Sequence, residues 1–288
     1  RMRIRKLLQE TFWRKKKIAL FCNLQDEAVI ESIDADTIYD VPLLMKKERL
    51  DKVVLERLKL QLRDEPGLER WQNFLTNYKN PKQTVNVALV GKYVELQDAY
   101  KSIQEALVHA GVPNLCSVNV ISVHSEELNS DNVAEELKGM HGIIVAPGFG
   151  QRGLDGKIIA IKHARENRVP FFGICLGMQC CVIEFARNVL KLEDANSAEM
   201  NANTPYPVID IMEEQKAITN KGGTMRLGAY ACELKEGSLA KSIYGRTEIS
   251  ERHRHRYEFN NKYLEQFEAA GMMATGKNLE TGLVEIME

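Results

Sequence analysis

Four short apolar runs alternate with segments of helical spacing between residues 85 and 191. The runs are VNVALVG (85–91), CSVNVISV (116–123), GIIVAPG (142–148) and PFFGI (170–174). Helical segments of about ten to fifteen residues follow them, and this alternation is typical of βαβ units. Nearly continuous apolar strands suit a parallel sheet, because helices cover both of its faces. We therefore predict an α/β fold with a mostly parallel sheet flanked by helices.

The last third of the chain has a different pattern. Shorter runs with some alternation of apolar and polar residues follow one another there, namely YPVIDIM, MRLGAYACEL, RHRHRYEFN, MMATGK and LVEIME. Such runs predict short strands. We expect a small antiparallel part, either beside the parallel sheet or forming its outer strands.

The segment before residue 85 differs from both. KKKIALFCN (15–23) is a basic cluster that leads into an apolar run, and we expect a buried strand there. Between residues 61 and 84 the chain is mostly polar and contains two prolines and one glycine, as a connector does. We therefore predict a first domain at 1–60, an interdomain linker at 61–84 and a second domain at 85–288.

Composition argues against several classes of function. The chain is 44% hydrophobic and 27% charged, and its net charge of -1 provides no bulk field for nucleic acid or an anionic membrane. No apolar run reaches the roughly 20 residues that a membrane span requires. The cysteines are Cys22, Cys116, Cys175, Cys180, Cys181 and Cys232. Their spacing fits neither a zinc site nor a disulfide scaffold, so we predict free thiols, a cytoplasmic protein and no metal site in this chain.

Cys175 differs from the other cysteines because a glycine lies two residues away on each side, in GICLG. The thiol follows an apolar run, at the carboxyl end of a predicted strand, where ligands bind on parallel sheets. A strand, a sharp turn and a helix with a nucleophile at the turn is the arrangement of Gly-x-Ser-x-Gly hydrolases. Gly173 and Gly177 would remove side chains that clash in so tight a turn.

The predicted helix after Cys175 would favour the thiolate, because its first N–H groups and its partial positive charge lie beside the sulfur. The backbone N–H of Leu176 and that of Gly148, at the neighbouring strand end, could then stabilise an oxyanion. These are the components of acyl-transfer chemistry. The alternative is that Cys175 is a buried core thiol, as we read the other cysteines. That alternative explains neither the two glycines nor the strand-end position.

The longer stretch GICLGMQ resembles the nucleophile motif of class I (triad-type) glutamine amidotransferases. The stretches KIALFCN, VGKYVELQDAYKSIQEAL, GFGQRG, GGTMRLG and ERHRHRYE, in this order, resemble the CTP synthase family. The resemblance extends from about Lys15 to Glu288 and implies a flavodoxin-like glutaminase domain that releases ammonia from glutamine. It also implies an amidoligase domain that uses ATP and Mg²⁺ to convert UTP to CTP. A homotetramer with GTP as allosteric activator and CTP as inhibitor is implied as well.

The resemblance further implies roles for single residues, with Cys175 as the nucleophile. The oxyanion and glutamine-binding positions are Gly148, Leu176, Gly177, Met178, Gln179, Glu199 and Arg256. Among these, Glu199 would meet the amino group of glutamine and Arg256 would contact an end of the same substrate. The nucleotide-binding positions are Lys17, for UTP or CTP, and Ile33, Asp34 and Ala35, for ATP. Arg152 and Gly153 match the loop associated with activation by GTP.

Three of these residues have a plainer explanation. Glu199 could be an ordinary solvated carboxylate, and Arg256 could belong to a basic run on an exposed strand. Lys17 could be one of three surface lysines, since charge clusters usually face water. The resemblance favours the functional interpretation for all three.

Two parts of the family pattern are absent from this sequence. It contains no Gly-x-x-x-x-Gly-Lys-Ser/Thr phosphate loop, so we expect only about the last sixty residues of the amidoligase domain, with residues 1–14 unmatched. No His-Pro-Glu motif follows His255, so we expect the second domain to be truncated before its catalytic His and Glu. A thiol nucleophile needs an imidazole base and a carboxylate that orients it. His253 and His255 are the candidates that could substitute for that base.

Three functional hypotheses follow. The first is the glutaminase part of a CTP synthase with the end of its amidoligase, which cannot make CTP by itself. The second is a stand-alone class I amidotransferase of another pathway, which GGTMRLG and ERHRHRYE argue against. The third is a non-catalytic assembly or regulatory subunit that keeps the fold.

Overall fold

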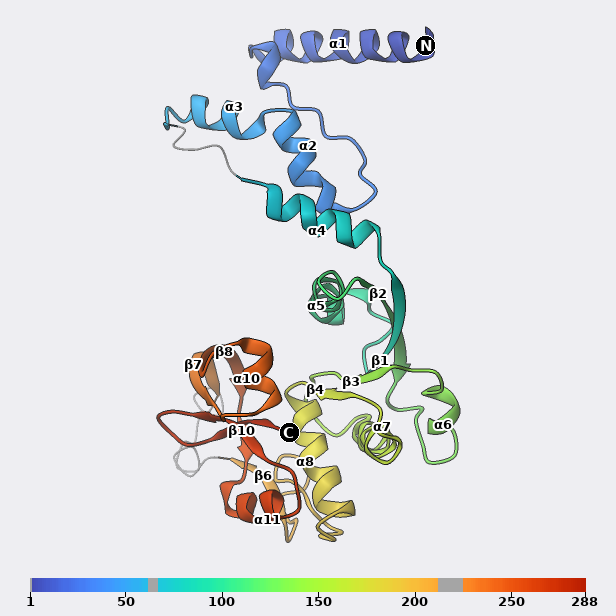
Figure 1. Ribbon diagram of the computed structural model, residues 1–288, viewed down its shortest axis with the longest axis vertical. Helices are drawn as coiled ribbons and strands as arrows, with labels where there is room; N and C mark the ends of the chain where they lie inside the picture. The colour runs from blue at the N-terminus through green and yellow to red at the C-terminus, as the bar shows by residue number, and fades with distance from the viewer. Residues whose placement is uncertain (1, 62–66, 212–224) are drawn as a thin grey trace. The chain divides into compact units, whose positions relative to one another are not determined.

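The computed structural model describes residues 2–61, 67–211 and 225–288, and the chain divides into two compact units, Arg1–Pro81 and Lys82–Glu288 (Figure 1). The predicted linker 61–84 contributes residues to both units, because it contains one helix of the first unit and the start of the first strand of the second.

The second unit contains the predicted parallel sheet. Its strands are β1 (Gln83–Gly91), β2 (Cys116–His124), β3 (Gly142–Val145) and β4 (Phe171–Gly173). They are all parallel and lie in the order β2-β1-β3-β4, so the sequence-based prediction is confirmed. Ala88, Leu89 and Val90 of β1 are wholly buried, as expected for a strand covered on both faces.

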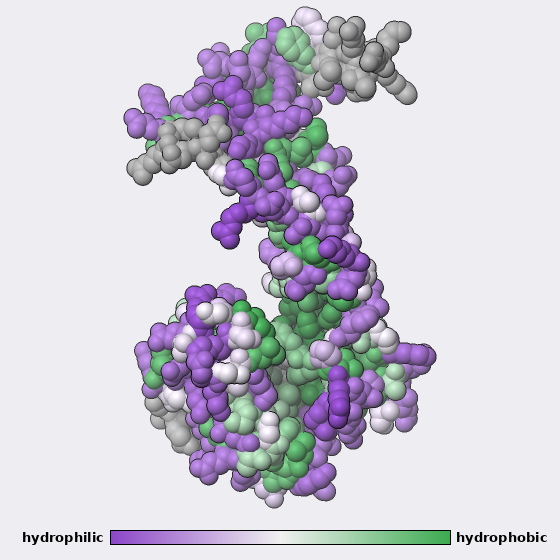
Figure 2. Space-filling model, viewed as in Figure 1, coloured by the Kyte–Doolittle hydropathy of each residue, from purple (hydrophilic) through white to green (hydrophobic). Residues whose placement is uncertain are grey.

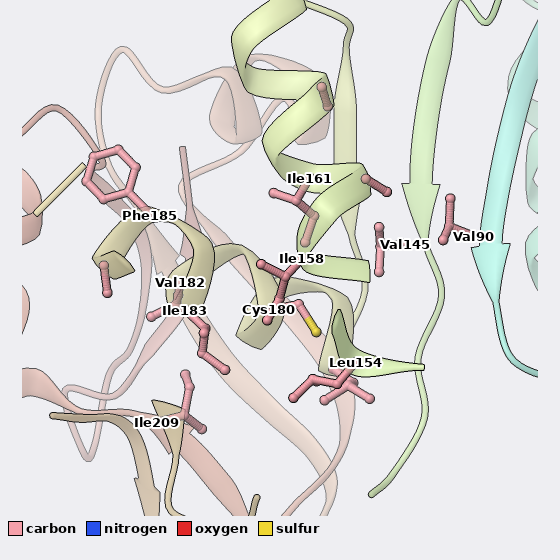
Figure 3. Packing of buried hydrophobic residues seen from close by; sticks show 14 of the residues in the cluster. Val90, Val145, Leu154, Ile158, Ile161, Cys180, Val182, Ile183, Phe185 and Ile209 are labelled. Atoms are coloured by element: carbon pink, nitrogen blue, oxygen red, sulfur yellow. The ribbon is translucent and has the colours of Figure 1, made fainter. Parts of the chain in front are cut away.

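Helices follow these strands as the alternation predicts. They are η3 (Gln97–Tyr100), α5 (Lys101–Gly111), α6 (Val133–Glu136), α7 (Leu154–Asn167) and α8 (Leu176–Asn188). The main core lies between the sheet and the helices α7 and α8, where Val145, Ile158, Ile161, Cys180 and Ile183 belong to one packed cluster (Figure 3). This core holds the ends of β3 and β4 next to the start of α8.

The later strands form two smaller sheets. The antiparallel sheet has the order β11-β10-β7-β8 and comprises β7 (Arg226–Leu234), β8 (Glu248–His255), β10 (Ala274–Asn278) and β11 (Val284–Met287). The other sheet has the order β5-β6-β9 and comprises β5 (Asn196–Ser197), β6 (Pro207–Ile211) and β9 (Tyr257–Phe259). The helices α10 (Leu239–Tyr244), η5 (Asn261–Tyr263) and α11 (Leu264–Ala269) connect these strands. The predicted antiparallel part is therefore present.

The first unit is helical. It comprises α1 (Met2–Cys22), η1 (Asp26–Ala28), η2 (Ile38–Asp40), α2 (Val41–Lys47), α3 (Leu50–Arg57) and α4 (Glu69–Lys79). The buried strand expected at 15–23 is wrong, because α1 extends through this segment. A buried strand needs neighbouring strands for its backbone hydrogen bonds, and none occurs among the described residues of this unit. A helix satisfies those groups internally, and it leaves Leu20 and Phe21 80% and 78% exposed.

Aromatic side chains hold α4 to the rest of the first unit. The ring of Tyr39 meets Trp71, Phe74 and Tyr78 edge-on, with ring centroids 5.2 to 6.0 Å apart. The indole N–H of Trp71 also donates to the carbonyl oxygen of Tyr39 at 2.9 Å. Buried Tyr and Trp side chains combine apolar area with one polar atom that needs a partner, and this cluster supplies both.

Hydrophilic side chains cover most of the face in Figure 2, and hydrophobic side chains occur there in smaller groups. Within the described part of the chain, no helix combines the length and the apolar character that crossing a membrane requires.

Candidate active site

Cys175 occupies a strained turn between β4 and α8, with φ 56° and ψ −108°. A non-glycine residue in such a conformation costs about 1–3 kcal/mol and is typical of functional sites. A Cβ on Gly173 would lie 2.6 Å from the backbone carbonyl carbon of Gly177, and a Cβ on Gly177 would collide with the carbonyl oxygen of Val145. The Gly-x-Cys-x-Gly spacing is therefore a steric requirement of this turn.

The environment of the Cys175 thiol contains opposing influences. Burial raises its pKa, and the backbone N–H of Leu176, directed at the sulfur, lowers it. The carboxylates of Glu258 and Glu199 raise the pKa further, whereas the ammonium of Lys157 lowers it. By contrast, burial raises the pKa of Cys180 and of Cys181 to about 12, as expected for core thiols.

A cavity of about 240 Å³ opens beside the thiol. Five residues selected from the sequence line it together: Gly148, Cys175, Gln179, Glu199 and Arg256. Drug-sized ligands occupy pockets of about 300 Å³ or more, so this cavity suits a smaller molecule. The sequence thus brings a thiol, a carboxylate, a guanidinium and an amide to one small site.

Sequence reasoning did not select four further residues that line the same cavity, namely Phe149, Met225, Arg254 and Tyr257, whereas His255, a candidate base, lines it as well. Phe149 directly follows Gly148, and Arg254 to Tyr257 surround the selected Arg256, so adjacency in sequence was the available signal. Met225 directly precedes β7 and had no such signal beyond the GGTMRLG motif.

Glu199 and Arg256 face the cavity from neighbouring segments. Glu199 follows β5, and Arg256 lies between β8 and β9. Burial raises the pKa of the Glu199 carboxyl, while the charge of Arg256 and the backbone N–H of Gly150 lower it. A half-buried carboxylate and a guanidinium in one cavity could bind the ammonium and carboxylate groups of an amino acid.

Gln179 connects the helix of the elbow to the second wall of the cavity. Its amide Nε2 donates to the backbone oxygen of Tyr257 at 2.9 Å, and its side chain is 8% exposed. This hydrogen bond fixes the amide orientation and holds β9 next to α8.

A buried charged network lies behind the cavity. Arg226, 5% exposed, pairs with Glu258 at 3.4 Å and also with Glu285. His253 Nε2 lies 3.2 Å from a carboxylate oxygen of Glu285, and the Nδ1 atoms of His253 and His255 are 3.2 Å apart. Burial, with the charges of His253 and Arg226, lowers the pKa of His255 to about 4. His255 is therefore neutral at neutral pH.

The remaining selected residues of the second unit lie elsewhere. Gly177 is buried beneath the elbow, and Met178 packs against the main core, so neither lines the cavity. Arg152 is exposed, pairs with Glu126 at 3.2 Å and has its guanidinium carbon 5.2 Å from the centre of the Tyr93 ring. Gly153 precedes α7 with φ 71°.

The residues selected in the first unit do not line its pocket. That pocket has a volume of about 390 Å³ and includes Lys15, Lys47, Glu48 and Arg49. Lys17 is exposed on α1, and Ile33, Asp34 and Ala35 lie in the irregular segment before η2. Across residues 2–61, 67–211 and 225–288, no group of three or more His, Cys, Asp or Glu side chains is arranged to hold a metal ion.

Two family models match the chain. The family model for glutamine amidotransferase class-I matches residues 95–288, and the model for CTP synthase N-terminus matches residues 2–60. The second match includes residues 2–14, so the expectation that this segment is unmatched is wrong. The CTP synthase of Cytophaga hutchinsonii is 65% identical over 274 residues, which are 95% of this chain and 51% of that protein. The CTP synthase of Flavobacterium johnsoniae is 60% identical over 274 residues, with the same two shares. The chain thus spans about half the length of these relatives.

A solved structure is similar as well. It is described as the glutaminase domain of Trypanosoma brucei CTPS with bound acivicin, and it is 38% identical with a TM-score of 0.66. The similarity covers 71% of this chain and 80% of that one. The chain therefore belongs to the class I glutamine amidotransferase family, and within that family its relatives are CTP synthases.

Proposed function

We propose that the second unit is the glutaminase of a CTP synthase, with Cys175 as its nucleophile. The observation that carries this proposal is the strained thiol of Cys175 at the mouth of a cavity that also contains Glu199 and Arg256. The longer protein would aminate UTP to CTP with ATP, using ammonia released from glutamine. The matches over both parts of the chain favour this function over a stand-alone or non-catalytic amidotransferase.

In the proposed reaction the Cys175 sulfur attacks the side-chain amide carbon of glutamine. The carbonyl π electrons move to the oxygen, and the backbone N–H groups of Leu176 and Gly148 would stabilise the resulting oxyanion. Collapse of this intermediate breaks the carbon–nitrogen bond, releases ammonia after protonation of the nitrogen, and leaves a thioester on Cys175. Water then attacks the thioester carbon, and glutamate leaves with regeneration of the thiol.

The other cavity residues would hold the substrate. The Glu199 carboxylate would pair with the α-ammonium group, and Arg256 with the α-carboxylate. Gln179 is held by Tyr257, so its amide oxygen would present a fixed acceptor to the substrate. These roles place the amide end of glutamine at the thiol.

A base must take the proton of the thiol. In the family that this chain resembles, the histidine of a His-Pro-Glu motif would take this role. Among the described residues His255 lines the same cavity as Cys175 and is neutral there, but burial lowers its pKa to about 4, so it is a weaker base than an ordinary imidazole. An activity that survives without the family motif but is lost in His255→Asn would assign the base to His255.

The first unit would belong to the amidoligase. Lys17 would contact UTP or CTP, and Ile33, Asp34 and Ala35 would contact ATP, whose Mg²⁺ would be held by residues outside the described part of this chain. Arg152 and Gly153 would take part in activation by GTP. We also propose a cytoplasmic homotetramer for the longer protein.

The experiment is active-site labelling with acivicin, the compound named in the similar Trypanosoma structure. Folded chain should be labelled at Cys175, located by peptide mass spectrometry, and excess glutamine should protect it. Glu199→Gln and Arg256→Met should each slow labelling, while Cys175→Ala should abolish it. Labelling of Cys175 that glutamine does not slow would contradict the proposed site.

A further inference from the structure

Lys157 is wholly buried on α7, with 0% of its surface exposed. A fully buried lysine is rare unless its ammonium group has partners, because burying an unpaired charge is costly. The rest of the buried face of α7 is apolar or small, and Leu154, Ile158 and Ile161 pack there (Figure 3). Nothing in the pattern of this helix requires a lysine, so its burial calls for a local explanation.

The contacts of Lys157 lie beneath the active site. Its Nζ donates to the backbone oxygen of Ala146 at 2.9 Å, directly after β3. The same nitrogen lies 3.6 Å from the position that a Cβ on Gly148 would occupy. The ammonium group therefore touches the turn whose Gly148 lines the cavity.

A second buried lysine holds the other side of this turn. Lys92, 5% exposed, follows β1, and its Nζ donates to the backbone oxygen of Phe149. The two lysines thus bind the carbonyl groups on either side of Gly148. A turn held at both ends keeps its N–H groups in one orientation, as a preorganised oxyanion site requires.

Lys157 also interacts electrostatically with the nucleophile. Burial is the main cause that lowers the pKa of Lys157, and the charge of Lys92 lowers it further. Negative charge on Cys180 and on Cys175 raises the same pKa. Other ionisable groups also surround Cys175. Glu258 and Glu199 disfavour its thiolate, the thiol of Cys180 is coupled to it, and Arg254, His255, Arg256 and Tyr257 line the same cavity. A buried cation near the sulfur offsets the two carboxylates.

We propose that Lys157 is a positioning residue for the glutaminase site, which fixes the Ala146–Gly148 turn through its ammonium group and favours the thiolate of Cys175 from below. The glutaminase activity named here rests on the proposed function. The coupling between the Lys157 and Cys175 side chains does not, because it can be measured without glutamine. Lys157 acts through the turn and the thiol, and it lies outside the residues that line the cavity.

The test is the pH dependence of Cys175 alkylation by iodoacetamide, which reacts with the thiolate. The modified peptide is quantified by mass spectrometry, because exposed Cys22 also reacts. Lys157→Met keeps the length and apolar stem but removes the charge and the donor. We expect its profile to move to higher pH by about one unit, so that labelling below the midpoint slows roughly tenfold. Ile158→Val, the next buried residue on α7, is the matched control and should leave the profile unchanged.

Lys157→Gln separates the two roles, because a glutamine can still donate to the Ala146 oxygen but carries no charge. We expect the same shift in the profile, with acivicin labelling at high pH closer to wild type than in Lys157→Met. A profile that stays at the wild-type position in folded Lys157→Met or Lys157→Gln overturns the charge coupling. Acivicin labelling at high pH that is equally fast in wild type and Lys157→Met overturns the role in the turn.

A measurement on the unsubstituted chain covers the case in which neither variant folds. Coupling between two sites is reciprocal, so converting Cys175 to an uncharged thioether should lower the pKa of Lys157. This pKa is followed by the ¹³Cε chemical shift of labelled lysine, and an unchanged value overturns the proposal. Failure of the proposed function would look different: acivicin labelling would be insensitive to glutamine while the iodoacetamide profile still shifted.

Discussion

The side-chain amide of Gln179 donates to the backbone oxygen of Tyr257 across 78 positions of sequence, at 2.9 Å. Gln179 lies in the first turn and a half of the helix that begins at the elbow, and Tyr257 directly follows Arg256. One hydrogen bond therefore sets the separation between the nucleophile and the guanidinium on the opposite wall of the cavity.

Loss of this bond should affect both stability and substrate binding. Gln179→Met retains the length but removes the donor, and we expect a loss of about 1 kcal/mol in the free energy of unfolding. Half-saturation of acivicin labelling should also move to higher concentration. Gln266→Met, at an exposed position on α11, is the control and should leave both quantities unchanged. Equal effects of the two substitutions would argue against the role of the Tyr257 contact.

The elbow glycines should tolerate no side chain. Gly177→Ala places a Cβ against the carbonyl oxygen of Val145, and Gly173→Ala places one against the backbone of Gly177. Because backbone cannot move aside as a side-chain tip does, we expect each substitution to cost about 1–3 kcal/mol in denaturant unfolding. In Gly142→Ala the new Cβ would meet its nearest atom at an ordinary 3.6 Å, so stability should change little. Wild-type stability in Gly177→Ala would show that the turn can relax.

Arg226 should be essential to the packing behind the cavity. Arg226→Met leaves the buried carboxylates of Glu258 and Glu285 without their guanidinium, and removing one partner of a buried pair costs about 3–5 kcal/mol. Adding Glu285→Gln to that variant should recover part of the loss. The control is Lys138→Met, which breaks an exposed pair with Glu135 and should cost less than about 1 kcal/mol. A small effect of Arg226→Met in urea unfolding would contradict a buried network.

Stability should depend on pH through His255. Burial lowers the pKa of His255 from 6.5 to about 4, so the unfolded chain binds a proton at a higher pH than the folded chain does. The free energy of unfolding should therefore fall as the pH decreases from 6.5 to 4. The shift sets an upper limit of about 3 kcal/mol, and the real loss should be smaller because the His255 side chain is 20% exposed to solvent.

His255→Asn should flatten this part of the profile, measured by urea unfolding at several pH values. The carboxyls of Glu258 and Glu285 also contribute to the pH dependence of stability, and both are present in wild type and in His255→Asn. The raised pKa of Glu258 works in the opposite direction, and the lowered pKa of Glu285 contributes below about pH 4.5. Parallel profiles for wild type and His255→Asn would mean that His255 is not held neutral.

The parallel sheet and the elbow could be predicted because each depends on local pattern. Valine-rich runs that end near a glycine indicate buried strands, and the two glycines around Cys175 follow from steric exclusion within five residues. Resemblance added Glu199 and Arg256, which no periodicity would have selected.

Other features depend on contacts between distant segments. Lys157 reads as a surface lysine in sequence, and only the packing of α7 against the end of β3 buries it. The apolar run at 18–22 suits a strand, but a strand needs partners, and the segment forms part of α1 instead. Strand pairing within the smaller sheets, such as the parallel pair β5 and β6, also joins separate stretches of sequence, so no single stretch predicts it.

The chain has two tryptophans, Trp13 and Trp71, and both belong to the first unit, Trp71 within the aromatic cluster around Tyr39. Indole fluorescence excited at the red edge therefore observes the first unit alone, while the unit that carries the thiol contributes no such signal. Thermal unfolding can be recorded at the same time by indole emission and by the near-ultraviolet circular dichroism of the tyrosines. The comparison would show, without any label, whether the two units lose their structure together or in turn.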